Sequence, residues 1–323
     1  MKNALRFAFG KRSDWNLERL RLPRPELTLA AIGPLAIAAM CLVSWPAFSG
    51  AQGEDGSVAF GLWVGSVAIV LMAWSFLLAV RPKVLEPIFG GLDSMYRVHR
   101  WAGALAVVFM WLHTRAEPEI EGGILGVADS VADQATDLAG TAETMIYVLI
   151  ALTLLRLFPY RVWRLTHKLL GIPFALSCWH FYTAEKTYAN GSGWGWWFGV
   201  IMVIGLVAFV YRVVGIDMIS RGRHYKIDSA EHVGTTTRLK LTPTGRPIGQ
   251  RLGQFAFIKL DVPGLQEPHA FTVASPPDKP GLEFMIRHIG DWSNRLPEAD
   301  LVGRSVLVEG PYGEFEPFGH DHQ

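Results

Sequence analysis

The sequence predicts a membrane protein in two parts, an all-α bundle of six membrane-spanning helices followed by a small antiparallel β-barrel. Half of the 323 residues are hydrophobic, with 12 Trp and 18 Phe, which is too apolar for a soluble domain of this size. Apolar runs that approach the thickness of a bilayer recur through residues 27–220. From residue 221 onward, short β-rich runs alternate with turn residues.

Three regions are therefore expected: a basic cytoplasmic arm (1–26), a six-span transmembrane domain (27–220) and a barrel domain (221–323). The first apolar run is itself about long enough to span a bilayer, so no cleaved signal peptide is expected. Cys41 and Cys178 lie inside apolar runs and are interpreted as buried thiols. The six predicted spans are 27–48, 58–80, 95–114, 142–158, 163–182 and 194–216.

The distribution of Lys and Arg predicts the orientation in the membrane. Fifteen of them lie in the arm and in the second and fourth connections, whereas the outer loops hold only Arg115 and Lys186. The positive-inside rule then places both termini in the cytoplasm and the protein in the plasma (inner) membrane. A net charge of +1 gives no argument for a nucleic-acid partner.

The third loop is predicted to be an outer, acidic loop. Its interpretation is a solvated loop, with a mouth that gathers metal cations as the alternative. The acidic residues assigned to it are Glu117, Glu119, Glu121, Asp129, Asp133, Asp137 and Glu143.

Four histidines occur in pairs on the third and fifth spans, His99 with His113 and His167 with His180. At 1.5 Å per residue, the members of each pair lie roughly 20 Å apart along a helix. Both spans run from inside to outside, so His99 is expected to face His167 near the inner surface, and His113 to face His180 near the outer one. Two imidazoles on one iron leave no open position, which suits electron transfer through two haems.

The helical phase of the two pairs differs. His99 and His113 fall about 40° apart on an ideal helix, effectively on one face. His167 and His180 fall about 140° apart, and Pro173 between them is expected to change the winding. The alternatives are interior polar contacts for any single histidine and a haem-free transporter with histidine proton relays for the set. Candidate partners for inner haem propionates are Arg97, Arg100, Arg164 and Lys168.

The last hundred residues contain six short candidate strands separated by turn residues, which predicts a small antiparallel barrel on the cytoplasmic side. The expected strands are 224–227, 235–241, 255–260, 271–274, 283–289 and 305–308.

Five motifs in order resemble the NADPH oxidase and ferric reductase superfamily in its bacterial form, over residues from about 60 to 316. They are HRWAGALAVVFMWLHT, HKLLGIPFALSCWHF, HAFTVAS, IRHIGDWS and EGPYG. Members of that superfamily reduce FAD in the cytosol and pass single electrons through two b-type haems to an acceptor outside. The resemblance therefore implies a ferric reductase-like bundle and a ferredoxin-reductase-type FAD domain.

The resemblance also implies which barrel residues bind FAD. The usual flavin motif His-Pro-Phe-Thr is matched by His269, Phe271 and Thr272, with Ala270 in place of proline. Phe271 is expected to pack on the isoalloxazine, Thr272 to hydrogen-bond near its reactive edge, and His269 to approach the ribityl or phosphate part.

Further residues of the expected FAD site follow from the last two motifs. Arg287 offers a forked cation for the pyrophosphate, and Ser293 is expected to cap a short helix that faces the phosphates. Gly290 allows close backbone approach, and Trp292 is expected to pack nearby. The segment that usually closes the flavin domain is matched by Gly310, Pro311, Tyr312 and Gly313.

The expected activity is that of an NAD(P)H-dependent ferric reductase or NADPH oxidase-like enzyme, with ferric ion or O2 as the extracytoplasmic acceptor. The alternative is a haem and flavin subunit that passes electrons to a partner protein. Superfamily members carry a nicotinamide domain after the barrel. None is seen here, so NAD(P)H is expected to act only through a further domain or a separate reductase. Superoxide-forming members often have a histidine four residues after the outer third-span ligand, where this chain has Glu117.

Overall fold

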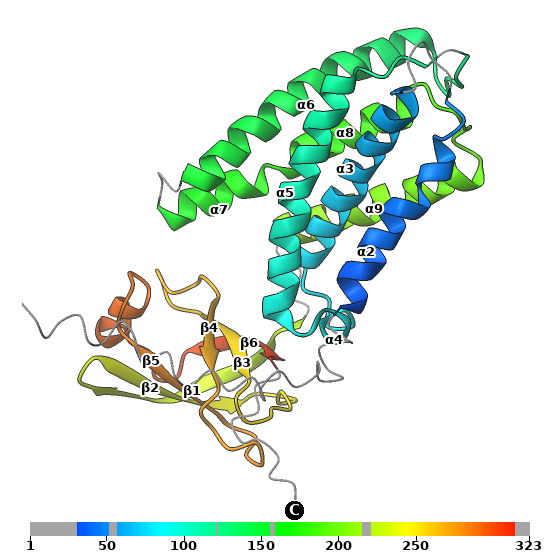
Figure 1. Ribbon diagram of the computed structural model, residues 1–323. Coiled ribbons are helices and arrows are strands. Elements are labelled where there is room, and N and C mark those ends of the chain that lie inside the picture. The colour runs from blue at the N-terminus through cyan, green and yellow to red at the C-terminus, as the bar shows by residue number, and fades with distance from the viewer. Residues whose placement is uncertain (1–30, 52–56, 121, 156–158, 215–220, 314–323) are drawn as a thin grey trace, which may run out of the picture.

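The computed structural model describes residues 31–51, 57–120, 122–155, 159–214 and 221–313. A helical bundle is followed by an antiparallel sheet, which confirms this part of the prediction (Figure 1). The predicted arm, residues 1–26, lies outside the described residues. The elements of the bundle are α2 (Ile32–Val43), η2 (Trp45–Ala47), α3 (Val58–Ala79), α4 (Glu86–Phe89), α5 (Leu92–Ala116), α6 (Asp129–Leu155), α7 (Tyr160–Lys168), α8 (Gly171–Thr183) and α9 (Gly193–Val214).

Three of the described helices, α3, α6 and α9, are long and apolar enough to cross a membrane. Helix α5 has 25 residues, about 37 Å at 1.5 Å per residue, but it also carries arginines and histidines. Helix α2 has only 12 described residues. The membrane character of the bundle is therefore clear, and the number of six spans stays a prediction.

Helix α6 begins earlier than the sequence pattern indicated. The predicted fourth span started at residue 142, but the helix starts at Asp129. Asp129, Asp133 and Asp137, which were assigned to the outer loop, therefore lie on an exposed side of α6. Their spacing of four residues keeps them on one face of the helix. The carboxylate in the first turn interacts favourably with the positive end of the helix dipole.

The predicted fifth span is two helices. Helix α7 ends at Lys168 and α8 begins at Gly171. Pro173 has no N–H to donate, so it is tolerated only in the first turn, where no intrahelical acceptor is required. The helix therefore restarts just before the proline, and His167 and His180 lie on different helices.

Helix α3 is the centre of the bundle and packs against both α5 and α9 (Figure 1). Val64 and Val70 of α3 are fully buried. Close approach of α9 depends on Gly205, because a Cβ added there would lie 2.8 Å from the Cα of Ala73 on α3. Small residues at such crossings let two helix backbones meet.

The barrel domain contains six antiparallel strands in the order β4-β3-β6-β1-β2-β5. The two edges meet at an isolated bridge between Val273 and Phe284, which curls the sheet toward closure. Alternating side chains such as Ile227, Leu239 and Val306 fill a separate core. The strands are β1 (Arg223–Val233), β2 (Thr236–Pro243), β3 (Phe255–Leu260), β4 (His269–Thr272), β5 (Leu282–Arg287) and β6 (Ser305–Tyr312), and η3 (Ser293–Glu298) precedes β6.

The barrel lies at the end of the bundle where α4 and α7 are found (Figure 1). The α3–α4 connection was predicted to be cytoplasmic, and α7 carries Arg164 and Lys168, which were counted among the cytoplasmic basic residues. The fold thus places the barrel next to the basic side of the bundle.

Candidate functional site

The structure brings His99 on α5 next to His167 on α7. Their ring centroids are 6.1 Å apart, and the ring planes make an angle of 76°. Trp163, one turn before His167, stacks on its ring at 5.2 Å with an angle of 7°. The inner pair predicted from the sequence is therefore close in space.

The Nδ1 atoms of two histidines contact backbone carbonyls of α3. His99 Nδ1 lies 2.8 Å from the Ser75 carbonyl oxygen and 2.9 Å from Ser75 Oγ. His113 Nδ1 lies 2.9 Å from the carbonyl oxygen of Gly61. A carbonyl can only accept a hydrogen bond, so Nδ1 must carry the proton and Nε2 keeps its lone pair. Metal-binding histidines usually donate such a hydrogen bond from the ring nitrogen that does not bind the metal.

The predicted outer pair consists of His113 in the last turn of α5 and His180 in the last turn of α8. A Cβ at Gly65 would lie 2.7 Å from His113 Nδ1, so this glycine makes room for the imidazole. His180 Nδ1 is buried and has no hydrogen-bond partner within the part of the chain that the structure describes. Buried polar atoms without a partner are rare in folded proteins.

The arrangement of the inner histidine pair fits a bis-histidine haem. Metal–imidazole nitrogen bonds are about 2.0 Å long, so two imidazoles on opposite sides of one iron have ring centroids about 6 Å apart. The 6.1 Å between His99 and His167 agrees with that value. Across the described ranges, no three His, Cys, Asp or Glu side chains gather as a metal-binding group. The inner pair, His99 and His167, offers two imidazoles, the number that an iron already held by a porphyrin requires.

Three aromatic side chains of the predicted flavin motifs form a cluster on the barrel. The rings of His269 and Trp292 are 4.7 Å apart, and those of Phe271 and Trp292 are 5.6 Å apart. Thr272, the last residue of β4, is exposed beside them. His269 Nε2 and Trp292 Nε1 are buried donors or acceptors that lack a partner among the residues described. The partly buried rings of His269 and Phe271, beside the exposed Thr272, offer a surface on which a planar ligand such as a flavin can pack.

The aromatic cluster is electrostatically linked to α7. Burial lowers the pKa of His269, Glu267 opposes this shift, and Arg164 on α7 adds to it. His269 is therefore predominantly neutral near pH 7, since its ordinary pKa is already below that value. Helix α7 also carries His167 of the inner pair.

Other predicted flavin residues lie around η3. Arg287 is exposed at the end of β5, and a Cβ at Gly290 would meet open space. Ser293 is the first residue of η3 rather than its cap, which corrects the prediction. Its Oγ accepts hydrogen bonds from the backbone N–H of Ile289 and Gly290 at 3.0 and 3.1 Å. The hydroxyl orders the loop, and those two amides already have an acceptor.

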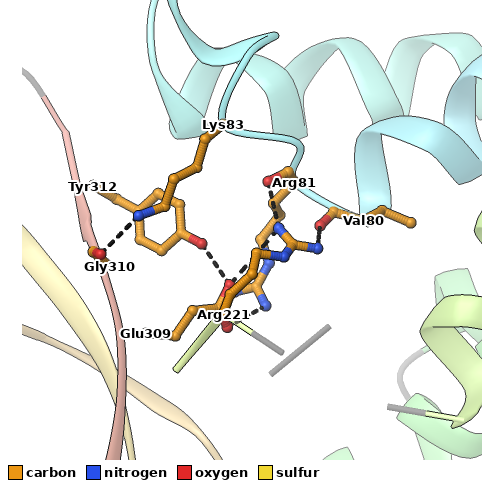
Figure 2. A network of polar contacts seen from close by, with 7 residues as sticks. All are labelled: Val80, Arg81, Lys83, Arg221, Glu309, Gly310 and Tyr312. Carbon is orange, nitrogen blue, oxygen red and sulfur yellow. Dashed lines mark hydrogen bonds and ion pairs between the residues drawn. The ribbon is translucent and has the colours of Figure 1, made fainter. Parts of the chain in front are cut away.

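Gly310, Tyr312 and Gly313 lie elsewhere. Tyr312 on β6 and Thr272 on β4 both pair with Phe255, which places them on opposite sides of β3, about 10 Å apart. The Gly310 carbonyl accepts a hydrogen bond from Lys83 Nζ at 2.7 Å, and the Gly313 N–H donates to Glu86 at 3.2 Å. These residues contact the α3–α4 connection instead of the aromatic cluster (Figure 2).

Of the basic residues expected near the inner pair, Arg97 forms an exposed ion pair with Asp93 at 3.5 Å, and Arg164 acts on His269 as described. Gly61, Gly65 and Ser75 were missed by the sequence reasoning. The available signal was the spacing of four between Gly61 and Gly65, which marks a close helix crossing.

Comparison with known proteins agrees with this geometry. Residues 64–178 match the family of ferric reductase like transmembrane components. This match and the yeast relative below confirm the predicted resemblance to the ferric reductase and NADPH oxidase superfamily. The chain is 22% identical over 289 residues to ferric/cupric reductase transmembrane component 7 of Saccharomyces cerevisiae. That match covers 85% of this chain and 45% of the relative.

Two further kinds of similarity were found. Over 125 residues it is 28% identical to methane monooxygenase component C of Methylosinus trichosporium, which covers 36% of each protein. Among solved structures, a flavohemoglobin from Malassezia yamatoensis matches with 12% identity and a TM-score of 0.31, over 86% of this chain and 64% of that one. The ferredoxin reductase of carbazole 1,9a-dioxygenase matches with 24% identity and a TM-score of 0.26, over 30% of each chain.

Proposed function

We propose that this protein is a transmembrane oxidoreductase that passes electrons from cytosolic FAD through two b-type haems to an acceptor outside the cell. The observation that carries the proposal is the separation of the two histidine pairs along the helices of the bundle. His99 and His113 lie on one continuous helix, α5, roughly 20 Å apart. His167 and His180 stand opposite them on α7 and α8.

When bound, FAD would accept electrons in pairs and release them singly, and bis-histidine haems would relay them one at a time. The chain's own contribution is to hold and orient these groups. The Ser75 and Gly61 carbonyls fix the rings of His99 and His113 with Nε2 available. The aromatic cluster of His269, Phe271 and Trp292 offers a surface on which a flavin ring can pack.

Electron flow from inside to outside is favoured by the membrane potential. The transfer of one electron out of a negative interior releases about 2.3 kcal/mol of electrical energy per 100 mV of membrane potential. The proposed final acceptor is ferric ion or O2, and the name of the yeast relative, a ferric/cupric reductase, favours a metal ion. NAD(P)H is the proposed source of electrons, supplied through a further domain or a separate reductase.

A second candidate is a haem and flavin subunit that hands electrons to a partner protein. The similarity to methane monooxygenase component C, named as one component of an enzyme, favours it. The two candidates differ in whether the chain alone reduces a small external acceptor.

The first experiment measures pigment in the full chain purified in lipid nanodiscs. We expect a reduced-minus-oxidised spectrum of cytochrome b type, with bound flavin. His99→Ala, His113→Ala, His167→Ala and His180→Ala should each lose roughly half of the haem, because each removes one ligand of one site. His224→Ala on the exposed start of β1 is the matched control and should keep all of it. A spectrum without cytochrome bands would instead support the haem-free transporter.

The second experiment measures transfer across a membrane. Vesicles containing the protein are loaded with dithionite, and a ferric chelate or O2 is supplied outside. Reduction outside that depends on all four histidines supports the enzyme. Loaded haem without external reduction supports the subunit. Adding NADH or NADPH instead of dithionite tests whether a nicotinamide donor reacts with this chain directly.

A further inference from the structure

A buried ion pair joins the two domains. Arg81 follows the end of α3, and Glu309 lies on β6, 228 residues later in the chain. Arg81 Nη2 and Glu309 Oε2 are 3.0 Å apart, and the side chains are only 3% and 0% exposed (Figure 2). Neither charge can be buried alone without a large desolvation cost, so each requires the other domain.

Arg221 adds a second cation to this pair from the start of the barrel domain. Its Nη1 lies 3.9 Å from Glu309 Oε1. The same guanidinium donates to the carbonyl oxygens of Arg81 and Val80, each at 2.8 Å (Figure 2). These carbonyls lie just beyond the C-terminus of α3, where a cation also interacts favourably with the helix dipole.

The remaining groups around the pair are oriented by it. Tyr312 donates its hydroxyl to Glu309 Oε1, and burial together with the Glu309 charge raises the pKa of this tyrosine. The Arg81 guanidinium lies 4.4 Å from the ring centre of Phe257 on β3. Arg81 also has a φ of 60°, a left-handed conformation that costs free energy for a residue with a side chain. The contacts with the barrel compensate for this strain.

We propose that Glu309 is a positioning residue that docks the barrel onto the membrane domain in one orientation. The docking contact, defined as Glu309 with Arg81 and Arg221, acts at β6, where Lys83 of the α3–α4 connection also donates to the Gly310 carbonyl at 2.7 Å. Two separate contacts restrict rotation of one domain against the other. This proposal rests on the function proposed above: the docking contact holds the aromatic cluster at a constant distance from the inner histidine pair.

The test measures the distance between spin labels on the two domains. Labels are placed at Arg97 on α5 and at Val302 before β6, both exposed, after Cys41→Ala and Cys178→Ala. The parent chain should give one narrow distance distribution. Glu309→Gln keeps the shape of the side chain but removes its charge, and this variant should broaden the distance distribution. Removing one partner of a buried ion pair lowers the ratio of docked to undocked protein by roughly a hundredfold or more.

The matched control is Glu283→Gln, which removes a carboxylate of the same barrel that pairs with Arg238 on the sheet surface. It should leave the distribution narrow. The double variant Arg81→Met with Glu309→Gln removes opposite charges together, so it guards against misfolding caused by an unpaired buried charge. It should recover part of the docked population relative to Glu309→Gln alone. A narrow distribution in Glu309→Gln, unchanged from the parent, would overturn the proposal.

A second readout connects docking to electron transfer. In Glu309→Gln we expect unchanged haem and flavin content, but slower haem reduction after flash photoreduction of the bound flavin. Unchanged transfer in a variant with broadened distances would show that docking does not control the reaction and would contradict this part of the proposal. The spin-label distances need neither cofactor, so failure of the haem and flavin assignment is distinguished from failure of the docking contact.

Discussion

Single uncharged residues of α3 orient the proposed haem ligands. The carbonyls of Gly61 and Ser75 accept from Nδ1 of His113 and His99, and this leaves Nε2 as the only ring atom that can bind iron. Gly65 has a different role, because its missing side chain provides the space for the His113 ring. These three residues matter for their backbone and their size rather than for a reactive group.

Gly65→Ala should therefore weaken the outer haem site selectively. The new Cβ would lie 2.7 Å from His113 Nδ1, so the ring must move. Disturbing the support of a ligand typically lowers affinity about 10- to 100-fold. Haem content and redox titration should show loss or a changed potential of one haem, with the other unchanged. Gly140→Ala on α6, where a Cβ meets nothing within 4 Å, is the control. Two unaltered haems in Gly65→Ala would contradict this role.

At the scale of elements, the break between α7 and α8 decides how the second histidine pair is presented. A continuous helix would point His167 and His180 in directions about 140° apart. The separate helices give each histidine its own axis, and the ring centroid of His167 lies 6.1 Å from that of His99 on α5. Packing of α8 and α9 against α3 then holds this arrangement, and it depends on a close contact between Gly205 and Ala73.

Gly205→Ala should push α9 away from α3 and destabilise the bundle. The added Cβ would lie 2.8 Å from a backbone atom, which cannot move aside as a side chain can. Overpacking of this kind costs about 1–3 kcal/mol. Gly199→Ala on the same helix meets nothing within 4 Å, and replacing glycine by alanine in a helix gains up to about 1 kcal/mol. Thermal unfolding of both variants in detergent should shift in opposite directions. A stable Gly205→Ala would show that the crossing is loose.

For the whole molecule, the barrel and the α3–α4 connection are on the same side of the bundle, joined by Arg81 and Glu309. This connection is one of the basic segments predicted to be cytoplasmic, so the positive-inside rule and the domain contact predict the same orientation. The end of α5 and the start of α6 lie at the opposite end of the bundle (Figure 1).

Labelling with a membrane-impermeant maleimide tests this orientation in whole cells. Glu119→Cys should be labelled from outside, whereas Val302→Cys in the barrel should react only after the cells are permeabilised. Both positions are exposed, and Cys41→Ala with Cys178→Ala provides a background free of other thiols. Labelling of Val302→Cys in intact cells would reverse the proposed topology.

Local patterns were sufficient to predict a region of apolar helices followed by six strands, because hydrophobic periodicity and turn residues act over short distances. They also singled out the four histidines as candidate haem ligands. Haem binding by those histidines stays a prediction. Tertiary structure decided the rest. It placed the acidic residues before position 142 on helix α6, separated Tyr312 from the aromatic cluster, and joined Glu309 to an arginine 228 residues away. In the sequence, Arg81 is indistinguishable from any other positive-inside residue, because a buried ion pair exists only once the chain has folded both charges into one place.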